Sequence, residues 1–204
     1  MAGDYLMDPA SADAIRTYVK NGGTVIMTAF SAKVDEHNQW FDTPLPGRLS
    51  DVFGLKTNAF YHKGGPLSGK IGDSDFTTPI DFYEVLEPSS AQILGRLTNV
   101  DDTPPAVTIN TFGKGQAIYV ATPADPAIMA PLYRSLYARL GIVPGPRTPN
   151  GVYARVVNGR TLYVNTTTEP KDVPLDRDTK GLLSGQTWHA SLRLDAYGVD
   201  LTDQ

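Results

Sequence analysis

The apolar run TVIMTAF at residues 24–30 constrains the fold of this chain more than any other segment. It is nearly continuous and begins with β-branched residues, which is typical of a strand buried on both faces of a parallel sheet. A helix is predicted before it, because Asp8 can cap free N–H groups, Pro9 suits a first turn, and Asn-Gly-Gly at 21–23 can end it. Helix, glycine turn and buried strand together indicate an α/β domain.

The middle of the chain is predicted to hold short strands and one further helix. One or two helical turns are expected over residues 48–53, and a surface loop over residues 63–79, which are rich in Gly, Ser, Asp and Thr. Asp125 and Pro126 predict the start of a second long helix, which Gly141 ends. Strands are expected over 55–61, 81–86, 91–97, 106–112 and 116–121, the last two as a hairpin.

A linker rich in proline and glycine at residues 144–151 separates two parts of the chain that differ in predicted secondary structure. After it, residues 152–165 predict a hairpin with an Asn-Gly turn, which is a strong local signal. Short alternating stretches follow, at 171–175, 181–183, 188–194 and 199–201, and no helix is indicated. We therefore predict two domains: an α/β sheet flanked by helices over 1–146, and a small antiparallel β domain over 147–204.

The composition excludes several classes of function. The chain has no cysteine, which rules out disulfides, thiolate metal sites and a cysteine nucleophile. The net charge is −4 and no run of Lys and Arg occurs, so neither nucleic acid nor an anionic membrane is expected as a partner. No apolar run approaches the ~20 residues of a membrane span, and the first residues lack the features of a signal peptide. A cytoplasmic location is expected.

Paired acidic residues are the first candidates for catalysis. Glycoside hydrolysis needs two carboxyl groups ~5–10 Å apart across the scissile bond. The candidate pairs are Asp35 with Glu36, Asp101 with Asp102, and Asp73 with Asp75. The side chains of neighbouring residues in extended backbone point apart, and acidic residues in turns and polar loops are usually solvated. No catalytic role is therefore expected for these pairs.

Other catalytic and ligand-binding patterns are incomplete. Ser31 follows the first strand but lacks the flanking glycines of a nucleophile elbow. His37, His62 and His189 do not have metal-ligand spacing, and no phosphate-binding glycine loop occurs. No catalytic residue, cofactor or metal is therefore predicted. Trp40 stands out in a polar loop, where a tryptophan either folds back onto its own domain or is buried in a neighbour.

Several segments together resemble the family-42 glycoside hydrolases, the β-galactosidases. The resemblance to their middle domain rests on YLMDP at 5–9, AIRTYVKNGGTVIMT at 14–28, VDEHN at 34–38, PGRLSDVFGL at 46–55 and GKGQAIYVAT at 113–122. The tail is similar to the small C-terminal β domain of the same enzymes, through GVYARV at 151–156, GRTLYVNTT at 159–167, KGLLSG at 180–185 and LDAYGVDL at 194–201.

The resemblance implies a fold like that of class I glutamine amidotransferases, and a role in trimerisation. It implies no catalysis in this chain, because the two catalytic glutamates of the family lie in a barrel domain that this sequence does not contain. Amidotransferase chemistry is not implied either, since it needs a cysteine. In the family a further strand and helix precede the segment at 5–9, so an open sheet edge is expected here.

We therefore expect a non-catalytic part of a β-galactosidase that assembles with its own copies as a trimer, or with a catalytic barrel. The expected contact residues are Asp35, Glu36, Trp40 and Arg48 in the loop after the first strand. Two alternatives remain open. One is a carbohydrate-binding module that uses Trp40 or Trp188, and the other is a stand-alone hydrolase that uses Ser31 or paired carboxylates.

Overall fold

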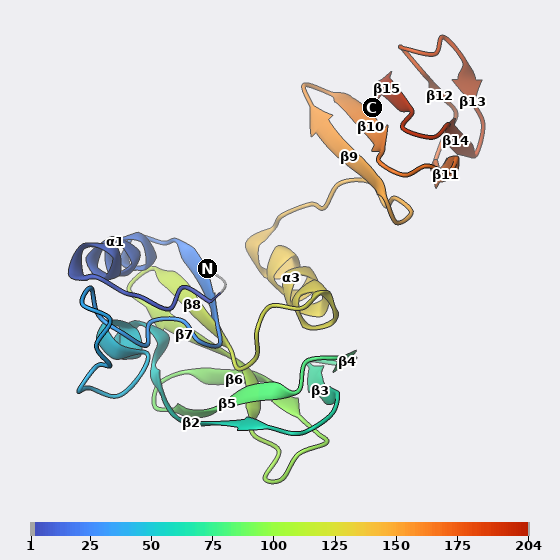
Figure 1. Cartoon of the computed structure of the whole chain (residues 1–204). Coiled ribbons are helices and arrows are strands. Elements are labelled where there is room, and N and C mark those ends of the chain that lie inside the picture. Colours follow the sequence, from blue (N-terminus) through green and yellow to red (C-terminus); the bar gives the residue numbers. More distant parts are fainter. Residues whose placement is uncertain (1–2, 204) are drawn as a thin grey trace. The chain divides into compact units, whose positions relative to one another are not determined.

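A computed structural model describes residues 3–203 and divides the chain into two compact units, Met1–Arg139 and Leu140–Gln204 (Figure 1). The first unit contains helices and a mixed sheet, and the second contains strands. No helix within residues 3–203 is both long enough and apolar enough to cross a bilayer.

The first unit begins with the predicted helix and strand. Helix α1 spans Pro9–Lys20, and the Asp8 carboxylate caps it by accepting a hydrogen bond from the Ser11 N–H at 2.9 Å. Strand β1 spans Thr24–Thr28, two residues shorter than predicted, because the chain turns at Phe30, whose φ is 62°. The local signals of cap, proline and glycine therefore located both elements.

The central sheet has six strands in the order β1-β8-β7-β6-β3-β4. β1 pairs in parallel with β8 and forms one edge of the sheet, whereas the other neighbours pair in antiparallel fashion. The sheet is thus mixed, with one parallel pair. Its further strands are β8 (Gly115–Val120), β7 (Pro105–Phe112), β6 (Gln92–Leu97), β3 (Leu67–Ile71) and β4 (Ser74–Thr78).

The expectation of a surface loop over residues 63–79 is wrong, because this segment contains the β3–β4 hairpin. The glycines that suggested a loop serve close packing instead. A Cβ at Gly69 would lie 2.3 Å from the carbonyl oxygen of Arg96, and one at Gly95 would lie 2.5 Å from that of Lys70. Gly72, with φ of 56°, lies in the turn between the two strands.

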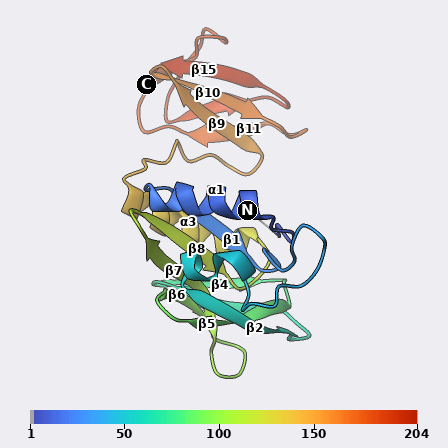
Figure 2. The same cartoon turned by 90° about the vertical axis from the view of Figure 1, so that its left-hand side faces the viewer.

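Helices cover both faces of the sheet, as Figures 1 and 2 show for α1 and α3 (Pro126–Leu140). The core under α1 also includes α2 (Ser50–Phe53), which follows the short 3₁₀ helix η1 (Gly47–Leu49), and residues of the two-stranded sheet of β2 (Leu55–His62) and β5 (Phe82–Pro88). Alternate residues of β8 reach the two cores: Tyr119 enters the first, and Ile118 enters the core beneath α3.

The second unit contains three small antiparallel sheets, β15-β10-β9, β11-β14 and β12-β13. The predicted hairpin is present, with Asn158 and Gly159 between β9 and β10. The expected strand over 188–194 is interrupted at Ala190, whose φ is 59°, and residues 181–183 form a turn with one bridge at Gly181. The strands are β9 (Val152–Val157), β10 (Arg160–Asn165), β11 (Lys171–Pro174), β12 (Thr179–Lys180), β13 (Thr187–Trp188), β14 (Ser191–Leu194) and β15 (Val199–Asp203).

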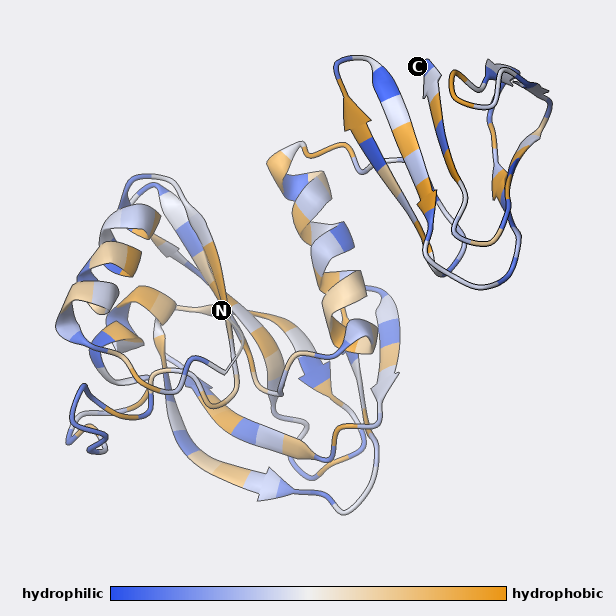
Figure 3. Cartoon of the chain, turned by 45° about the horizontal axis from the view of Figure 1, so that its top comes forward, coloured by the Kyte–Doolittle hydropathy of each residue, from blue (hydrophilic) through white to orange (hydrophobic). Residues whose placement is uncertain are grey.

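The β15-β10-β9 sheet has an unusual polarity. Hydrophobic and hydrophilic residues alternate along β10 (Figure 3), but the buried positions are Thr161, Tyr163 and Asn165, whereas Leu162 is 37% exposed. On β15, Thr202 is buried and Val199 is 45% exposed. A half-buried strand normally turns its apolar face inward, so this sheet carries hydroxyl groups where aliphatic side chains are usual.

Candidate functional site: the loop after β1 and the Trp40 cleft

The loop at residues 31–46 precedes η1 and carries three of the four predicted contact residues, Asp35, Glu36 and Trp40, whereas the fourth, Arg48, lies in η1. Asp35 organises its first turn, since its Oδ1 accepts hydrogen bonds from the N–H groups of His37 and Gln39, both at 2.9 Å. These bonds, that from Gln39 foremost, lower the pKa of the Asp35 carboxyl. Asp35 therefore shapes the loop from within.

Glu36 and Arg48 are brought together as an ion pair with an N–O distance of 2.9 Å. Arg48 also donates to the carbonyl oxygen of Met7 at 2.8 Å, and its guanidinium lies 5.1 Å from the ring centre of Phe41. Hydrogen bonds from its own backbone N–H and from Arg48 lower the pKa of the Glu36 carboxyl. Arg48 therefore connects the loop, through Glu36, to the segment that precedes α1, through Met7.

Trp40 stands apart from this ion pair and is 53% exposed. Its ring meets that of Tyr5 edge to face, with centroids 6.3 Å apart. Trp40 also lines a cleft of about 120 Å³, together with Phe30, Leu45 and Phe60. Phe60 is 54% exposed and Phe30 is 36% exposed. We call this the Trp40 cleft, and exposed aromatic rings dominate its rim.

A buried polar cluster lies at the floor of the Trp40 cleft. The Nζ of Lys33 lies 2.8 Å from Oε1 of Glu84 and 3.1 Å from Oγ1 of Thr57. The Tyr119 hydroxyl donates to Oε2 of Glu84 at 2.8 Å, and the Phe30 N–H donates to Oε1 at 3.1 Å. Burial lowers the pKa of the Lys33 ammonium, although Glu84 opposes the shift, and burial raises the pKa of the Tyr119 phenol.

This cluster is suited to holding the loop rather than to reacting. Both carboxylate oxygens of Glu84 already accept hydrogen bonds, and the Lys33 ammonium is paired with the same carboxylate. Neither Lys33 nor Glu84 is among the site residues predicted from the sequence. A signal was available, because Glu84 lies between the buried residues Phe82 and Leu86 on one face of β5, where a charged side chain requires a partner.

The other catalytic candidates are dispersed. Ser31 is fully buried, and its hydroxyl accepts a hydrogen bond from the Asp4 N–H at 3.3 Å. Asp102 lies in a turn with φ of 59°, and Asp75 is 3.7 Å from Lys70 on the β3–β4 hairpin. Within the described residues, no group of three or more His, Asp and Glu side chains could hold a metal ion.

Trp188, the second predicted sugar-stacking residue, is half-buried in the second unit. Its indole N–H donates to Oδ2 of Asp200 at 3.0 Å, and its ring packs against the core of that unit. His189 is exposed and lies 2.7 Å from Asp178. Neither Trp188 nor His189 lines the cleft of about 620 Å³ in the second unit.

Comparison with known proteins identifies relatives along nearly the whole chain. Beta-galactosidase Pbg of Clostridium perfringens is 27% identical over 212 residues, which covers 96% of this chain and 31% of the relative. Beta-galactosidase BglY of Alicyclobacillus acidocaldarius is 26% identical over 217 residues, which covers 98% of this chain and 31% of the relative. The chain therefore spans less than a third of the length of these enzymes.

Solved structures show the same architecture. Gan42B, a GH42 beta-galactosidase from G. stearothermophilus, superposes with a TM-score of 0.80 at 26% sequence identity, over 99% of this chain and 31% of that protein. A model of one family, described as the beta-galactosidase trimerisation domain, matches residues 4–143 and so covers the first unit and the start of the linker. The chain belongs to the β-galactosidase trimerisation-domain family of the family-42 glycoside hydrolases.

Proposed function

We propose that this chain is a non-catalytic assembly part of a β-galactosidase, and that its first unit holds copies of the enzyme together as a trimer. The family to which the chain belongs is named for trimerisation, and the relatives that match along nearly the whole chain are β-galactosidases. In a three-fold ring each copy offers two different surfaces to its neighbours, so one patch meets a second, unlike patch on the next copy.

The exposed aromatic rings around the Trp40 cleft are the observation that carries this proposal. Tyr5, Phe30, Trp40 and Phe60 are between 36% and 54% exposed, and ring contacts or the shared cleft connect them. Interfaces concentrate Trp and Tyr at their centres with charged groups at the rim. Trp40 is accordingly the proposed centre of contact, with Glu36 and Arg48 as further contact residues and Asp35 shaping the loop.

The buried cluster beneath the cleft supports the same proposal. Lys33, Glu84 and Tyr119 fix the base of the loop by charged hydrogen bonds within the core, so the exposed rings are presented on a rigid support. A contact surface that is already ordered loses less conformational entropy when it binds.

Light scattering coupled to size-exclusion chromatography tests the proposal. The unsubstituted chain is expected to form trimers, and Trp40→Ala is expected to dissociate them at concentrations at which the unsubstituted chain stays assembled. Tyr18→Ala is the matched control, because Tyr18 is 56% exposed on α1 and does not line the Trp40 cleft. A trimer that Trp40→Ala leaves intact, or a chain that remains monomeric throughout, would contradict the proposal.

Catalysis is proposed to reside outside this chain. The chain covers 31% of its relatives, and the resemblance places both catalytic glutamates of the family in the barrel domain. The purified chain is therefore expected to release no chromophore from a nitrophenyl β-galactoside. Turnover that survives purification to homogeneity, and that a substitution in this chain abolishes, would refute this part of the proposal.

Three finer assignments belong to the same proposal. The parallel pair β1–β8 with α1 is proposed to correspond to the core of an amidotransferase-like sheet, and β1 supplies the open edge. The domain boundaries are proposed at 1–146 and 147–204, because residues 141–149 contain neither helix nor strand. The proposed location is the cytoplasm.

A further inference from the structure

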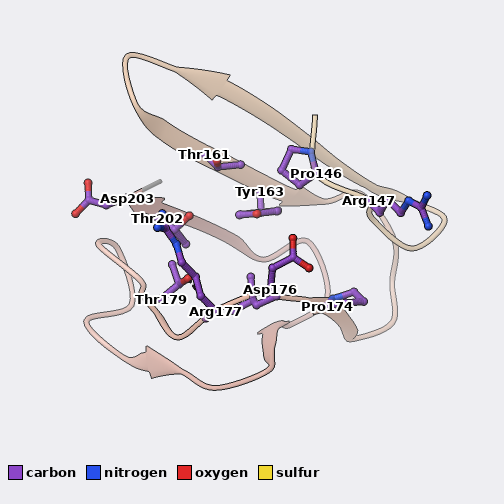
Figure 4. A pocket seen from close by; sticks show the side chains of 11 residues that line it. Pro146, Arg147, Thr161, Tyr163, Pro174, Asp176, Arg177, Thr179, Thr202 and Asp203 are labelled. Atoms are coloured by element: carbon purple, nitrogen blue, oxygen red, sulfur yellow. Dashed lines mark hydrogen bonds between the residues drawn. The ribbon is translucent and has the colours of Figure 1, made fainter. Parts of the chain in front are cut away.

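The second unit contains a cleft of about 620 Å³. It is bordered on one side by the inward face of the β15-β10-β9 sheet and on the other by the segment after β11 (Figure 4). Its volume falls within the range of about 300–1,000 Å³ that is usual for small-molecule sites. All of its lining residues belong to the second unit.

The floor of the cleft consists of hydroxyl-bearing side chains. Thr161 and Tyr163 lie on the same face of β10, and Thr202 lies directly opposite Thr161 on β15. Their exposures are 3%, 4% and 2%. Burial raises the pKa of the Tyr163 phenol, a hydrogen bond with Thr161 opposes the rise, and the Asp176 carboxylate adds to it. The inverted polarity of the sheet therefore has a local consequence: it places hydroxyl groups at the base of a cleft.

Four charged side chains line the cleft: Arg147, Asp176, Arg177 and Asp203, of which Asp203 is paired with Arg160. In Figure 4 the Asp176 carboxylate reaches towards Tyr163, and the Arg177 side chain reaches towards Thr202. Among residues 3–203, neither Asp176 nor Arg177 has an ion-pair partner, whereas Asp178 pairs with His189 and Asp172 with Arg193 in the same unit. A carboxylate acceptor and a guanidinium donor in the cleft are thus available to a ligand.

The charges and apolar surfaces decide which ligand chemistry fits. The cleft is lined by two arginines, Arg147 and Arg177, and two aspartates, Asp176 and Asp203, so its net charge favours neither an anion nor a cation at Asp176 and Arg177. A neutral polyhydroxylated molecule meets both groups, because adjacent hydroxyls can donate to a carboxylate and accept from a guanidinium. Pro146 and Pro174 add apolar surface, against which the C–H face of a sugar ring can pack.

We propose that the cleft between β10, β15 and the segment 174–179 binds a neutral saccharide of one or two units. Asp176 accepts from adjacent sugar hydroxyls, Arg177 donates to a sugar oxygen, and Tyr163, Thr161 and Thr202 hydrogen-bond the side of the ring that enters the cleft. The site lies within the second unit and does not depend on trimer assembly.

Nuclear magnetic resonance titration of the full chain tests this proposal. Galactose, glucose, arabinose, mannose and lactose are added separately up to about 50 mM, well above the millimolar Kd of a small polar site. At least one of these sugars is expected to shift the amide signals of Tyr163, Arg177 and Thr202. Phosphate and sulfate at the same concentrations serve as anionic probes, and they are expected to leave those signals in place.

Substitutions assign the binding to the cleft. Asp176→Asn and Arg177→Gln are each expected to weaken sugar binding about tenfold, since each removes a hydrogen bond to a charged group. The matched controls Asp178→Asn and Arg193→Gln alter exposed charged residues of the same unit outside the cleft, and they are expected to keep Kd within about twofold. The amide spectrum of each variant verifies its fold.

Three outcomes would overturn the proposal. One is that none of the five sugars shifts the signals of cleft residues. Another is that phosphate or sulfate shifts them while the sugars do not, which would make the cleft an anion site. The third is sugar binding that Asp176→Asn and Arg177→Gln leave unchanged, which would place the sugar elsewhere on the chain.

Discussion

The ammonium of Lys33 lies 2.8 Å from a carboxylate oxygen of Glu84, and the two side chains are only 3% and 2% exposed. Two opposite charges removed from water stabilise a fold only while both are present. The pair lies directly beneath the Trp40 cleft, with Tyr119 and Thr57 as further hydrogen-bond partners. Disruption of this pair therefore affects the stability of the first unit and the surface that the unit presents.

Lys33→Met is expected to destabilise the first unit by about 3–5 kcal/mol, because it leaves the Glu84 carboxylate buried without its cation. Urea unfolding followed by circular dichroism measures the change. The double variant with Glu84→Gln is expected to recover part of the loss. Lys70→Met is the control: it removes an exposed pair with Asp75 at 3.7 Å and is expected to cost less than about 1 kcal/mol. Equal losses of unfolding free energy for Lys33→Met and Lys70→Met would contradict this expectation.

Asp200 is the corresponding buried carboxylate of the second unit. Its side chain accepts hydrogen bonds from the Ser184 hydroxyl at 2.6 Å, the Trp188 indole at 3.0 Å and the Leu201 N–H at 2.8 Å. Asp200→Asn is expected to cost about 1–3 kcal/mol, because a neutral amide replaces the charged acceptor. The emission of Trp188 during denaturation, in a Trp40→Phe background, reports on this unit. Asp203→Asn on the same strand is the exposed control.

The same carboxylate makes the second unit sensitive to acid. Burial alone would raise the pKa of Asp200, but hydrogen bonds from Ser184 and Trp188 outweigh it and lower the pKa below its ordinary 3.8. The resulting stability is fully present above pH 3.8 and is lost as the pH falls through the lower folded-state pKa. The free energy of unfolding should therefore fall as the pH drops below 3.8, and Asp200→Asn should reduce this loss. An equal loss in both proteins would show that other groups cause it.

Arg48 is expected to control the order of the loop after β1. Arg48→Gln removes the ion pair with Glu36 and weakens the anchor to the Met7 carbonyl. Hydrogen exchange at the amides of His37 and Gln39, which bond to Asp35, should then speed up about tenfold. Arg96→Gln, which removes a bond to the Thr103 carbonyl elsewhere, is expected to leave those two amides unchanged. No change in either variant would show that the Asp35 turn is stable by itself.

Gly69 permits close approach of two strands, so Gly69→Ala is expected to destabilise the first unit. The new Cβ would lie 2.3 Å from the Arg96 carbonyl oxygen, and relief of such overlap costs about 1–3 kcal/mol. Gly65→Ala is the matched control, since the nearest atom is the Lys63 Nζ at 3.9 Å. Thermal unfolding should separate the two. Equal melting temperatures would show that the β3–β6 pairing adapts without cost.

Local sequence signals predicted those parts of the fold that depend on neighbouring residues. The Asp8 cap, Pro9 and the glycines at 21–23 located α1 and β1 because each acts within one turn of backbone. The hairpin of residues 63–79 was missed for the opposite reason. Gly69 resembles a loop residue until its partner strand is known, and that strand, β6, lies more than twenty residues further along the chain.

The candidate site likewise combines residues that the sequence predicts with residues that come together only in the folded chain. Trp40, Glu36 and Arg48 could be singled out from composition, because an exposed tryptophan among charged residues is conspicuous in a polar loop. The Lys33–Glu84 pair and the hydroxyl floor at Thr161 and Thr202 come from strands that meet only in the folded chain. Alternation along β10 predicted a strand, yet hydropathy alone would have placed Leu162 inside.

The inverted polarity of the β15-β10-β9 sheet also affects any attempt to shorten the chain. Val164 is flanked across the strands by Tyr153 and Val199, and these two neighbours are 68% and 45% exposed. A fragment cut at the proline-rich linker would retain this exposed apolar row, which would then make up a larger share of its surface. Such a fragment should enhance the fluorescence of a dye such as anilinonaphthalene sulfonate, adhere to column matrices and precipitate as it is concentrated.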